Sequence, residues 1–395
     1  DYIQDINEMK KNGPWKLPMG TLDRFHFSLL VLFSKISWFT KKVYILHESS
    51  VSPAYTILQA YIKRNVGFDS CYERNLPYSS LFSFSVTKKA SAGEDNFIGG
   101  QGLAEDRATA FSTALGEFLE RMITGLLDLN KKIIYKSAKQ LSETDDIVYP
   151  PKFHRQLPIQ KELYSYLNHS ENDVIAWVKA RNLVTKKDVY IPKKMTAWFS
   201  ENRKRTDNRF MNATTNGSAG YFSRTSATLR GLLEVVQRDA FLVHYLTMTA
   251  PQLIDVTTLP NDLQDKIKGI ASHGISLYIT NVTSIQIPSV TIVAINSEAV
   301  IKQVVVSAAS AVTFSEALGA ALKEMVLAQG MFYYTGTETE LAIIGNKSKP
   351  FVTPFGKNSR QLYWRGDDIV KEFEWFISGK KVSYNDLIKN ECAYK

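Results

Sequence analysis

Three stretches of this chain, far apart from one another, share a pattern in which a small residue and a leucine precede a glutamate at fixed spacing. They are Ala114-Leu115-Gly116-Glu117, Gly231-Leu232-Leu233-Glu234 and Ala321-Leu322-Lys323-Glu324. Each stretch lies in a segment with helical periodicity, which predicts helices over residues 105–129, 226–247 and 314–332. This repeat constrains the fold, because three such helices are able to bring their glutamates together in space.

In the first two segments, polar side chains continue on the glutamate face of the predicted helix. Glu117 is followed by an acid and an arginine, and Glu234 by an amide and an arginine, at the same offsets of three and four. These followers are Glu120, Arg121, Gln237 and Arg238. Residues at such offsets share one helix face. One interpretation is an ordinary intrahelical pair of glutamate and arginine, worth about 0.2–0.5 kcal/mol.

A second interpretation is a cation and phosphate site. The residues around Glu117 and Glu234 are apolar on most sides, and helices of that kind are expected to be buried. A buried carboxylate stays ionised only beside a cation or a hydrogen-bond donor. Carboxylate oxygens suit hard cations such as Mg²⁺, and arginine suits phosphate through bidentate contacts.

The composition excludes several other classes of protein. The net charge of +9 is spread along the 395 residues without a dense basic block, so a nucleic-acid-binding tail is not indicated. Cys71 and Cys392 are the two cysteines of the sequence, too few for a disulfide framework. The apolar run over 25–39 contains His26 and Lys35, is too short to span a bilayer, and reads as a buried helix. We therefore expect a cytoplasmic protein that binds neither nucleic acid nor membrane.

Strand-like segments rich in β-branched and aromatic residues alternate with the helices, so the predicted fold class is α/β with mixed sheets. The predicted strands lie at 43–46 and 81–86, as a pair joined by a turn within 177–191, and at 275–279, 290–295 and 304–306. We predict three parts, an N-terminal α/β segment over 1–85, a core over 86–340 and a C-terminal segment over 341–395.

Two glycine-containing segments precede the first two glutamate helices. The segment 98–102 reads as a glycine turn that could present backbone N–H groups to an anion, although a plain turn explains it equally well. Asn216-Gly217 also reads as a turn. Neither segment is a P-loop, because no Gly-Lys-Ser/Thr follows.

At these residues the chain resembles the YcaO family, over roughly residues 85–340. The segment from Gly99-Gly100-Gln101-Gly102 to Arg121 is similar to the family signature Ser-Gly-Lys-Gly…Ser-Ala-Leu-Gly-Glu-x-x-Glu-Arg. The segment from Asn216 to Ala240 resembles Asn-Gly-x-Ala…Leu-Leu-Glu-x-x-Glu-Arg-Asp-Ala, and the one from Ala317 to Glu324 resembles Ala-Leu-x-x-Ala-x-x-Glu. The sequence from Arg238 to Leu246 is most similar to the azoline-forming cyclodehydratase (D protein) branch.

The resemblance implies a YcaO-type fold whose core binds ATP and Mg²⁺ among the glutamate helices. Family members phosphorylate a peptide amide oxygen, and in the azoline branch a Cys, Ser or Thr side chain then closes a ring. Carried over by position, the metal ligands are Glu117, Glu120, Glu234 and Glu324. The implied nucleotide-binding residues are Thr113, Arg121, Asn216, Gln237 and Arg238.

Several positions depart from the family pattern. Gln101 stands where the family has lysine, and Gln237 where it has glutamate. Ser226 replaces a frequent acid, Phe222 a frequent Asn or His, and Leu327 a frequent Gln. Together these replacements weaken the implied cation site, which leaves open fewer or weaker Mg²⁺ sites, or an inactive protein.

The resemblance also implies partners and leaves alternative activities open. A precursor peptide is the implied substrate, with an E1-like leader-peptide-binding protein and a flavin-dependent dehydrogenase as partners, in a homodimer or hetero-complex. The alternatives are a YcaO enzyme that forms thioamides or amidines, and a degenerate, non-catalytic scaffold in a peptide-modifying complex.

Overall fold

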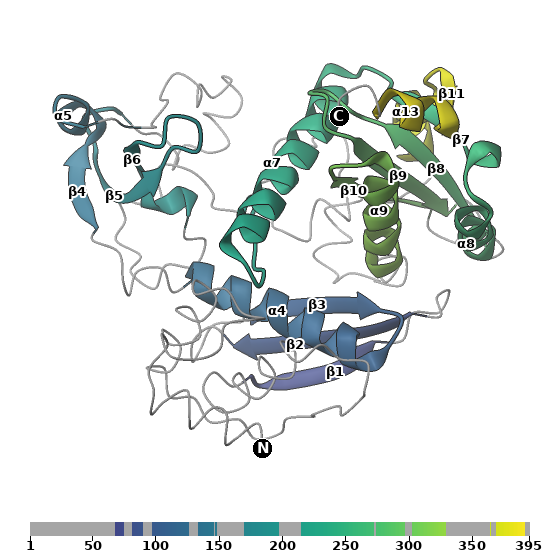
Figure 1. Cartoon of the computed structure of the whole chain (residues 1–395), viewed down its shortest axis with the longest axis horizontal. Coiled ribbons are helices and arrows are strands. Elements are labelled where there is room, and N and C mark those ends of the chain that lie inside the picture. The colour runs from purple at the N-terminus through teal and green to yellow at the C-terminus, as the bar shows by residue number, and fades with distance from the viewer. Residues whose placement is uncertain are drawn as a thin grey trace. The chain divides into compact units, whose positions relative to one another are not determined.

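The computed structural model describes eleven parts of the chain: 68–74, 81–89, 97–125, 133–145, 147, 170–196, 215–271, 274–296, 302–328, 364 and 369–391. Helices and strands alternate along these residues, which confirms the predicted α/β class (Figure 1). The segments predicted at 25–39 and 43–46 lie outside the described residues.

The described residues divide into two compact units that are interleaved along the chain. The first unit contains the described residues up to Phe118 and those from Ala219 onward, and the second contains the described residues between Leu119 and Ser218. The predicted boundary after residue 85 falls inside a strand, and residue 340 lies outside the described part.

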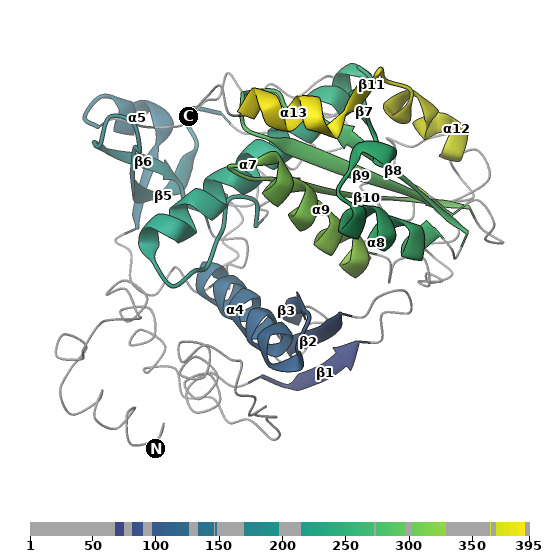
Figure 2. The ribbon, with the colours of Figure 1, turned by 45° about the vertical axis from the view of Figure 1, so that its right-hand side comes forward.

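The first unit begins with a small antiparallel sheet and most of a long helix, whose residues from Leu119 onward belong to the second unit. The strands β1 (Ser70–Arg74), β2 (Phe82–Lys89) and β3 (Phe97–Ala104) pair in that order. Helix α4 (Arg107–Gly125) follows β3 and lies across one face of this sheet (Figure 2).

Helix α4 starts and packs for reasons that its sequence makes clear. The Asp106 carboxylate accepts the backbone N–H of Thr109 at 2.8 Å, which satisfies one of the free donors of the first turn. Its apolar stripe is buried, and the ring of Phe111 meets that of Phe84 on β2 edge to face at 5.6 Å between centroids. The predicted helix over 105–129 is confirmed as far as Gly125.

The second sheet of the first unit has five strands in the order β10-β9-β8-β7-β11. Neighbouring strands are antiparallel, except that β11 runs parallel to β7. The bounds are Gln252–Asp255 for β7, Ile275–Asn281 for β8, Ser289–Asn296 for β9, Gln303–Ser310 for β10 and Lys381–Ser383 for β11. The strands predicted from β-branched runs at 275–279, 290–295 and 304–306 are therefore confirmed.

Both faces of this sheet are covered. Ile292 and Ala294 of β9 share one core with α8 (Asn261–Ala271), α9 (Phe314–Ala328) and α13 (Tyr384–Glu391). Val293 and Ile295 of β9 belong to another core, with α7 (Arg224–Thr247), α12 (Ile369–Phe373) and the 3-10 helix η7 (Glu374–Ile377). A strand buried on both faces reads as a continuous apolar run, as β9 does.

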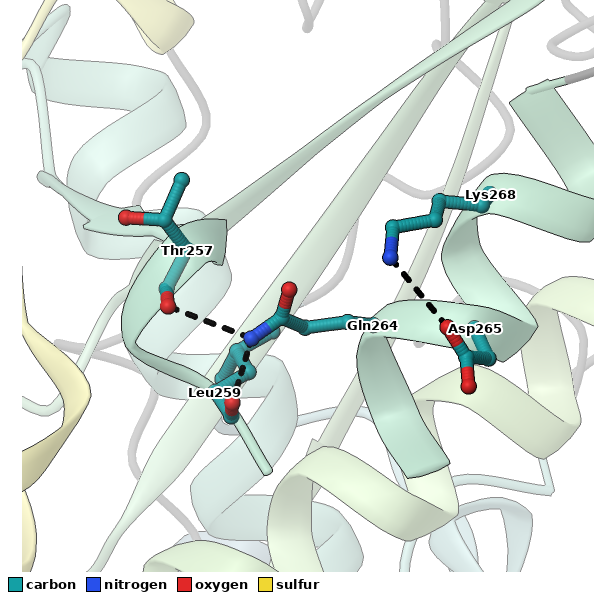
Figure 3. Close-up of polar contacts among 5 residues, drawn as sticks. All are labelled: Thr257, Leu259, Gln264, Asp265 and Lys268. Atoms are coloured by element: carbon teal, nitrogen blue, oxygen red, sulfur yellow. Dashed lines mark hydrogen bonds and ion pairs between the residues drawn. The ribbon is translucent and has the colours of Figure 1, made fainter. Parts of the chain in front are cut away.

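Helix α8 is tied to the short 3-10 helix η5 (Val256–Thr258) that precedes it. The side-chain amide of Gln264 donates to the carbonyl oxygens of Thr257 at 3.1 Å and Leu259 at 2.8 Å (Figure 3). Lys268 and Asp265 form an exposed ion pair at 3.2 Å on the same helix. The amide contacts satisfy two carbonyls that the turn leaves without a helical partner.

The second unit contains an antiparallel sheet with strand order β4-β5-β6. The strands are β4 (Ile134–Ser137), β5 (Val174–Arg181) and β6 (Asp188–Pro192), followed by the 3-10 helix η3 (Lys193–Met195). Strands β5 and β6 confirm the hairpin predicted within 177–191. Trp177 is fully buried beside α5 (Ala138–Ser142), and its indole N–H donates to the Lys136 carbonyl at 2.9 Å.

Within the described ranges, no helix is both long enough and apolar enough to span a bilayer.

The thiol of Cys71 on β1 should react slowly with alkylating reagents. Burial raises the pKa of Cys71 from 9.0 to about 11. The reactive thiolate is therefore about 100-fold scarcer at pH 8 than for an ordinary thiol, and iodoacetamide should label Cys71 about 100-fold more slowly. The rate should climb as the pH rises toward 11.

This prediction is measured by mass spectrometry in a Cys392→Ser background, so that Cys71 alone reports. The same protein unfolded in urea is the control and should label at the ordinary rate. Equal labelling rates for the folded and unfolded protein at pH 8 would contradict the burial of this thiol.

Candidate functional site

The polar face of α4 carries four of the residues predicted from the sequence. Glu117 follows Thr113 at an offset of four, and Glu120 and Arg121 follow Glu117 at offsets of three and four. These offsets place all four on one side of the helix, away from its buried stripe. Thr113 is exposed, and its hydroxyl donates to the Thr109 carbonyl at 2.8 Å. Glu117, Glu120 and Arg121 are half-buried.

The glycine segment before α4 is a strand, so the prediction of a turn over 98–102 is wrong. Gly100 and Gly102 lie where β3 passes directly against the backbone of α4. A Cβ on Gly100 would come within 2.2 Å of the Ala114 carbonyl oxygen, and one on Gly102 within 1.9 Å of the Ala110 carbonyl oxygen. The glycines therefore allow a strand and a helix to approach closely.

The backbone of this strand binds a carboxylate of the protein. The N–H of Gln101 donates to Oε2 of Glu117, with 2.5 Å between nitrogen and oxygen. In this contact, Gln101 offers its backbone donor to the first of the three glutamates instead of to a free anion. This hydrogen bond holds the Glu117 side chain in place.

Helix α7 is less buried than its sequence suggested. Residues 226–247 are helical as predicted, with Ser223 capping the N-terminus, but apolar side chains on α7 face solvent. Leu232 is 50% exposed, Val235 45% and Leu246 73%, while the buried strip contains Gly231, Val236 and Ala240. The expectation that this helix is buried on most sides is therefore wrong. Helical periodicity reports which side chains are apolar, but not how many of them a neighbouring element covers.

The site residues on α7 lie along one side of this helix. Glu234 and Gln237 are half-buried, and Arg238 is exposed. Asn216 lies before the helix, in the turn that the sequence predicted. The N–H of Ser218 donates to the Thr215 carbonyl at 2.9 Å, and Gly217 has φ 85°, as the third position of a type II turn requires.

The third glutamate, Glu324, is exposed on α9. The confirmed helix ends at Ala328 within the described residues, and its apolar stripe is buried against β9 and β10. Helices α9 and α7 pack on opposite faces of the five-stranded sheet, so Glu324 and Glu234 lie on helices that the sheet separates.

The predicted site residues therefore come together within each helix, but not as one set. The four on α4 share a face, and so do those on α7. In the described part of the chain, no three His, Cys, Asp or Glu side chains come close enough to hold one metal ion. Glu120, Arg121 and Asn216 belong to the second unit, and the other predicted site residues to the first. The assignment of Glu117, Glu120, Glu234 and Glu324 as shared metal ligands stays a prediction.

The donor chemistry of these helices fits Mg²⁺ brought by a nucleotide. Glu117 supplies carboxylate oxygens, the donors that a hard cation prefers, and its orientation is fixed by the Gln101 N–H. Mg²⁺ in nucleotide sites is bound by one or two carboxylates together with phosphate oxygens and water. Such a site does not need a cage of three protein carboxylates.

One exposed cation on the Glu234 face of α7 was not among the predicted residues. The guanidinium carbon of Arg230 on α7 lies 4.2 Å from the centre of the Tyr221 ring. Arg230 is four residues from Ser226 and four from Glu234, so the helical spacing could have identified it as a member of the same face. Its contact with Tyr221 depends on the backbone conformation of the residues just before α7, and residue spacing does not predict that conformation.

Comparison with known proteins identifies one family. Residues 99–369, more than half of the chain, match the family model described as YcaO cyclodehydratase, ATP- and Mg²⁺-binding. This stretch contains every predicted site residue, and the description names the two cofactors that the sequence predicted. No curated protein sequence matches the chain.

Solved structures share the fold at low sequence identity. The YcaO protein from Methanopyrus kandleri bound with AMPPCP and Mg²⁺ is 17% identical, with a TM-score of 0.57 over 84% of this chain and 75% of that one. A heterocyclase in complex with substrate and cofactor is 13% identical, with a TM-score of 0.58 over 86% of this chain and 48% of that one. The Escherichia coli microcin synthetase McbBCD complex with pro-MccB17 bound contains a chain that is 15% identical, with a TM-score of 0.51 over 72% of this chain and 74% of that one.

Proposed function

Because this chain belongs to the YcaO family, we propose that it is an ATP-dependent cyclodehydratase that forms azoline rings in a ribosomally made precursor peptide. The observation that carries the proposal is the family match over 99–369, which spans all three glutamate helices. The similarity of the fold to a heterocyclase and to a microcin synthetase chain supports the same reaction class.

The proposed chemistry suits the groups on α4 and α7. An amide carbonyl carbon is a poor electrophile, and the amide oxygen is a poor leaving group. When ATP transfers a phosphoryl group to that oxygen, the oxygen becomes a good leaving group. A Cys, Ser or Thr side chain then adds to the amide carbon, and the oxygen departs as phosphate. Such a reaction needs positioning and neutralisation of phosphate charge more than covalent help from the protein.

In this proposal each polar face has a defined task. Glu117 and Glu120 of α4, with Glu234 and Glu324, hold Mg²⁺. Arg121 and Arg238 neutralise phosphate charge. The nucleotide is further bound by side chains that accept or donate hydrogen bonds without carrying charge, namely Thr113, Asn216 and Gln237.

We propose that the peptide is delivered by a separate partner that binds its leader segment, and that a flavin-dependent dehydrogenase acts on the product. The McbBCD complex, in which a chain of the same fold occurs in a multi-protein assembly with pro-MccB17 bound, supports this arrangement. The proposed site of action is the cytoplasm, where precursor peptide and ATP are both made.

A second candidate function has specific residues in its favour. Gln101, Ser226 and Gln237 each replace a charged residue of the family pattern. A member that has lost these charges would act as a non-catalytic scaffold in a peptide-modifying complex.

The experiment that separates these functions is a reconstitution with the precursor peptide and partner encoded beside this gene. With Mg²⁺ and ATP, we expect ADP and phosphate to be released in proportion to the number of rings formed. Mass spectrometry of the peptide measures ring formation as the loss of one water per ring. The control is the same peptide with its Cys, Ser and Thr residues replaced by alanine, which should lose no water.

Other outcomes would each identify another function. Oxygen-to-sulfur exchange in the product would indicate a thioamide-forming enzyme. Binding of the peptide and partner without nucleotide turnover would support the scaffold and defeat the proposed enzyme.

A further inference from the structure

A tyrosine and an arginine at the start of α7 hold each other in place on the protein surface. The guanidinium carbon of Arg230 lies 4.2 Å from the centre of the Tyr221 ring, within the range of a cation–π contact. The Tyr221 ring meets the ring of Phe222 edge to face at 5.7 Å. Both partners remain accessible, since Tyr221 is 40% exposed and Arg230 is also exposed.

The arginine lies on the side of α7 that carries the predicted site. Ser226, Arg230 and Glu234 are separated by offsets of four, and Gln237 follows Arg230 at an offset of seven. Residues at these offsets project from one helix face. Arg230 therefore places a permanent positive charge one helical turn before Glu234. Position 234 is a glutamate both in this chain and in the family pattern.

The ring contact prepares the arginine for an anionic ligand. A guanidinium that lies over an aromatic ring still has N–H groups available, and these match the oxygens of a phosphate in a bidentate contact. Because the side chain is already ordered by Tyr221, it loses less conformational entropy when it binds.

The predicted site residues lack one of the cations in the family pattern, and Arg230 is another cation that could bind phosphate. Gln101 stands at the family's lysine position, so the strand beside α4 lacks a cation there. The N–H of Gln101 is used by the Glu117 carboxylate. A triphosphate carries several negative charges, and Arg230 is a cation of this chain on the face of Glu234 that can meet them.

We propose that Arg230, positioned by the Tyr221 ring, binds the triphosphate of ATP. This inference rests on the proposed function, since it assumes that the chain binds ATP. Arg230 is a nucleotide-binding residue in this proposal, and Tyr221 is a positioning residue.

The test is calorimetric titration of the full chain with ATP and with AMP, both in the presence of Mg²⁺. Arg230→Gln should weaken ATP binding about 10- to 100-fold, as expected for loss of a charge-assisted contact, and should leave AMP binding within about twofold. The ATP affinity of Arg230→Lys should lie between that of the wild type and that of Arg230→Gln. Tyr221→Phe keeps the ring and should bind ATP normally, whereas Tyr221→Leu should weaken ATP binding about threefold.

The matched control is Arg181→Gln, which removes an exposed arginine from the end of β5 in the second unit and should not change ATP binding. Thermal melts of all variants, which alter exposed side chains, should coincide with that of the wild type.

The outcomes separate this inference from the proposed function. If the wild type binds ATP and Arg230→Gln binds it equally well, the assignment of Arg230 is wrong and the proposed function stands. If Arg230→Gln loses ATP and AMP to the same degree, the arginine contacts the base, the ribose or the α-phosphate, which both nucleotides share, and the assignment of Arg230 to the β- and γ-phosphates is wrong. If the wild type itself binds no ATP, the proposed function and this inference both fail.

Discussion

ATP turnover should fall at least about 100-fold when Glu234 is replaced by glutamine, with little change in stability. Glutamine keeps the size and the carbonyl oxygen of the side chain but removes the charge that a hard cation and its nucleotide require. Glu234 is half-buried on the face of α7 that also carries Gln237. The measurement is peptide-dependent release of ADP and phosphate, alongside a thermal melt.

Glu117 offers a sharper version of this test, because its carboxylate also binds the backbone of β3. Glu117→Gln removes the charge but keeps an oxygen that can accept the Gln101 N–H. Glu117→Ala removes both. We expect both variants to lose turnover to a similar degree, and Glu117→Ala alone to lose about 0.5–1.5 kcal/mol of stability, because the hydrogen bond to the Gln101 N–H is lost.

The control for both glutamates is Glu143→Gln, which removes an exposed carboxylate next to α5 and should turn over ATP like the wild type. Wild-type turnover in both Glu117→Gln and Glu234→Gln would defeat the assignment of the glutamate helices to the nucleotide site.

Alanine at Gly100 or Gly102 should destabilise the first unit by about 3 kcal/mol or more. At both positions the added Cβ would meet main-chain atoms of α4, at 2.2 Å from the Ala114 carbonyl oxygen and 1.9 Å from the Ala110 carbonyl oxygen. Main-chain atoms in the middle of a helix cannot turn aside as a flexible side chain does, so the strand and the helix must separate. Urea unfolding of each variant measures the loss.

Gly116 in the middle of α4 is the matched control, because a Cβ there would meet no atom within 4 Å. Gly116→Ala should be neutral or stabilise the protein by about 0.4–1 kcal/mol, since alanine favours helix and restricts the unfolded chain. If Gly100→Ala and Gly116→Ala behaved alike, the close approach of β3 to α4 would be wrong.

The sequence was informative wherever a pattern depends on neighbours along the chain. The helices Arg224–Thr247 and Phe314–Ala328, and the interior strand Ser289–Asn296, appear at the places that periodicity and β-branched runs predicted. The grouping of Thr113, Glu117 and Arg121 on one side of α4 also follows from spacing alone.

The sequence was misleading where contacts between distant segments decide. Gly100 and Gly102 have the composition of a turn, but they lie in a strand that pairs with β2, where the absence of a Cβ lets α4 approach closely. The apolar residues of α7 predicted a buried helix, yet Leu232 and Leu246 are exposed because β9 and β10 cover one strip of it. Neither outcome is encoded in local propensity.

By itself, the amino-acid sequence determined the class of the fold, the family, and the helix faces on which the glutamates, Arg121 and Arg238 lie. These properties depend on the regular geometry of a helix, in which a side chain's direction follows from its position in the chain. Only the tertiary structure decided that the Gln101 N–H holds Glu117, that α7 and α9 take opposite faces of one sheet, and that Tyr221 holds Arg230. Such contacts join elements whose mutual placement depends on packing, which no local pattern specifies.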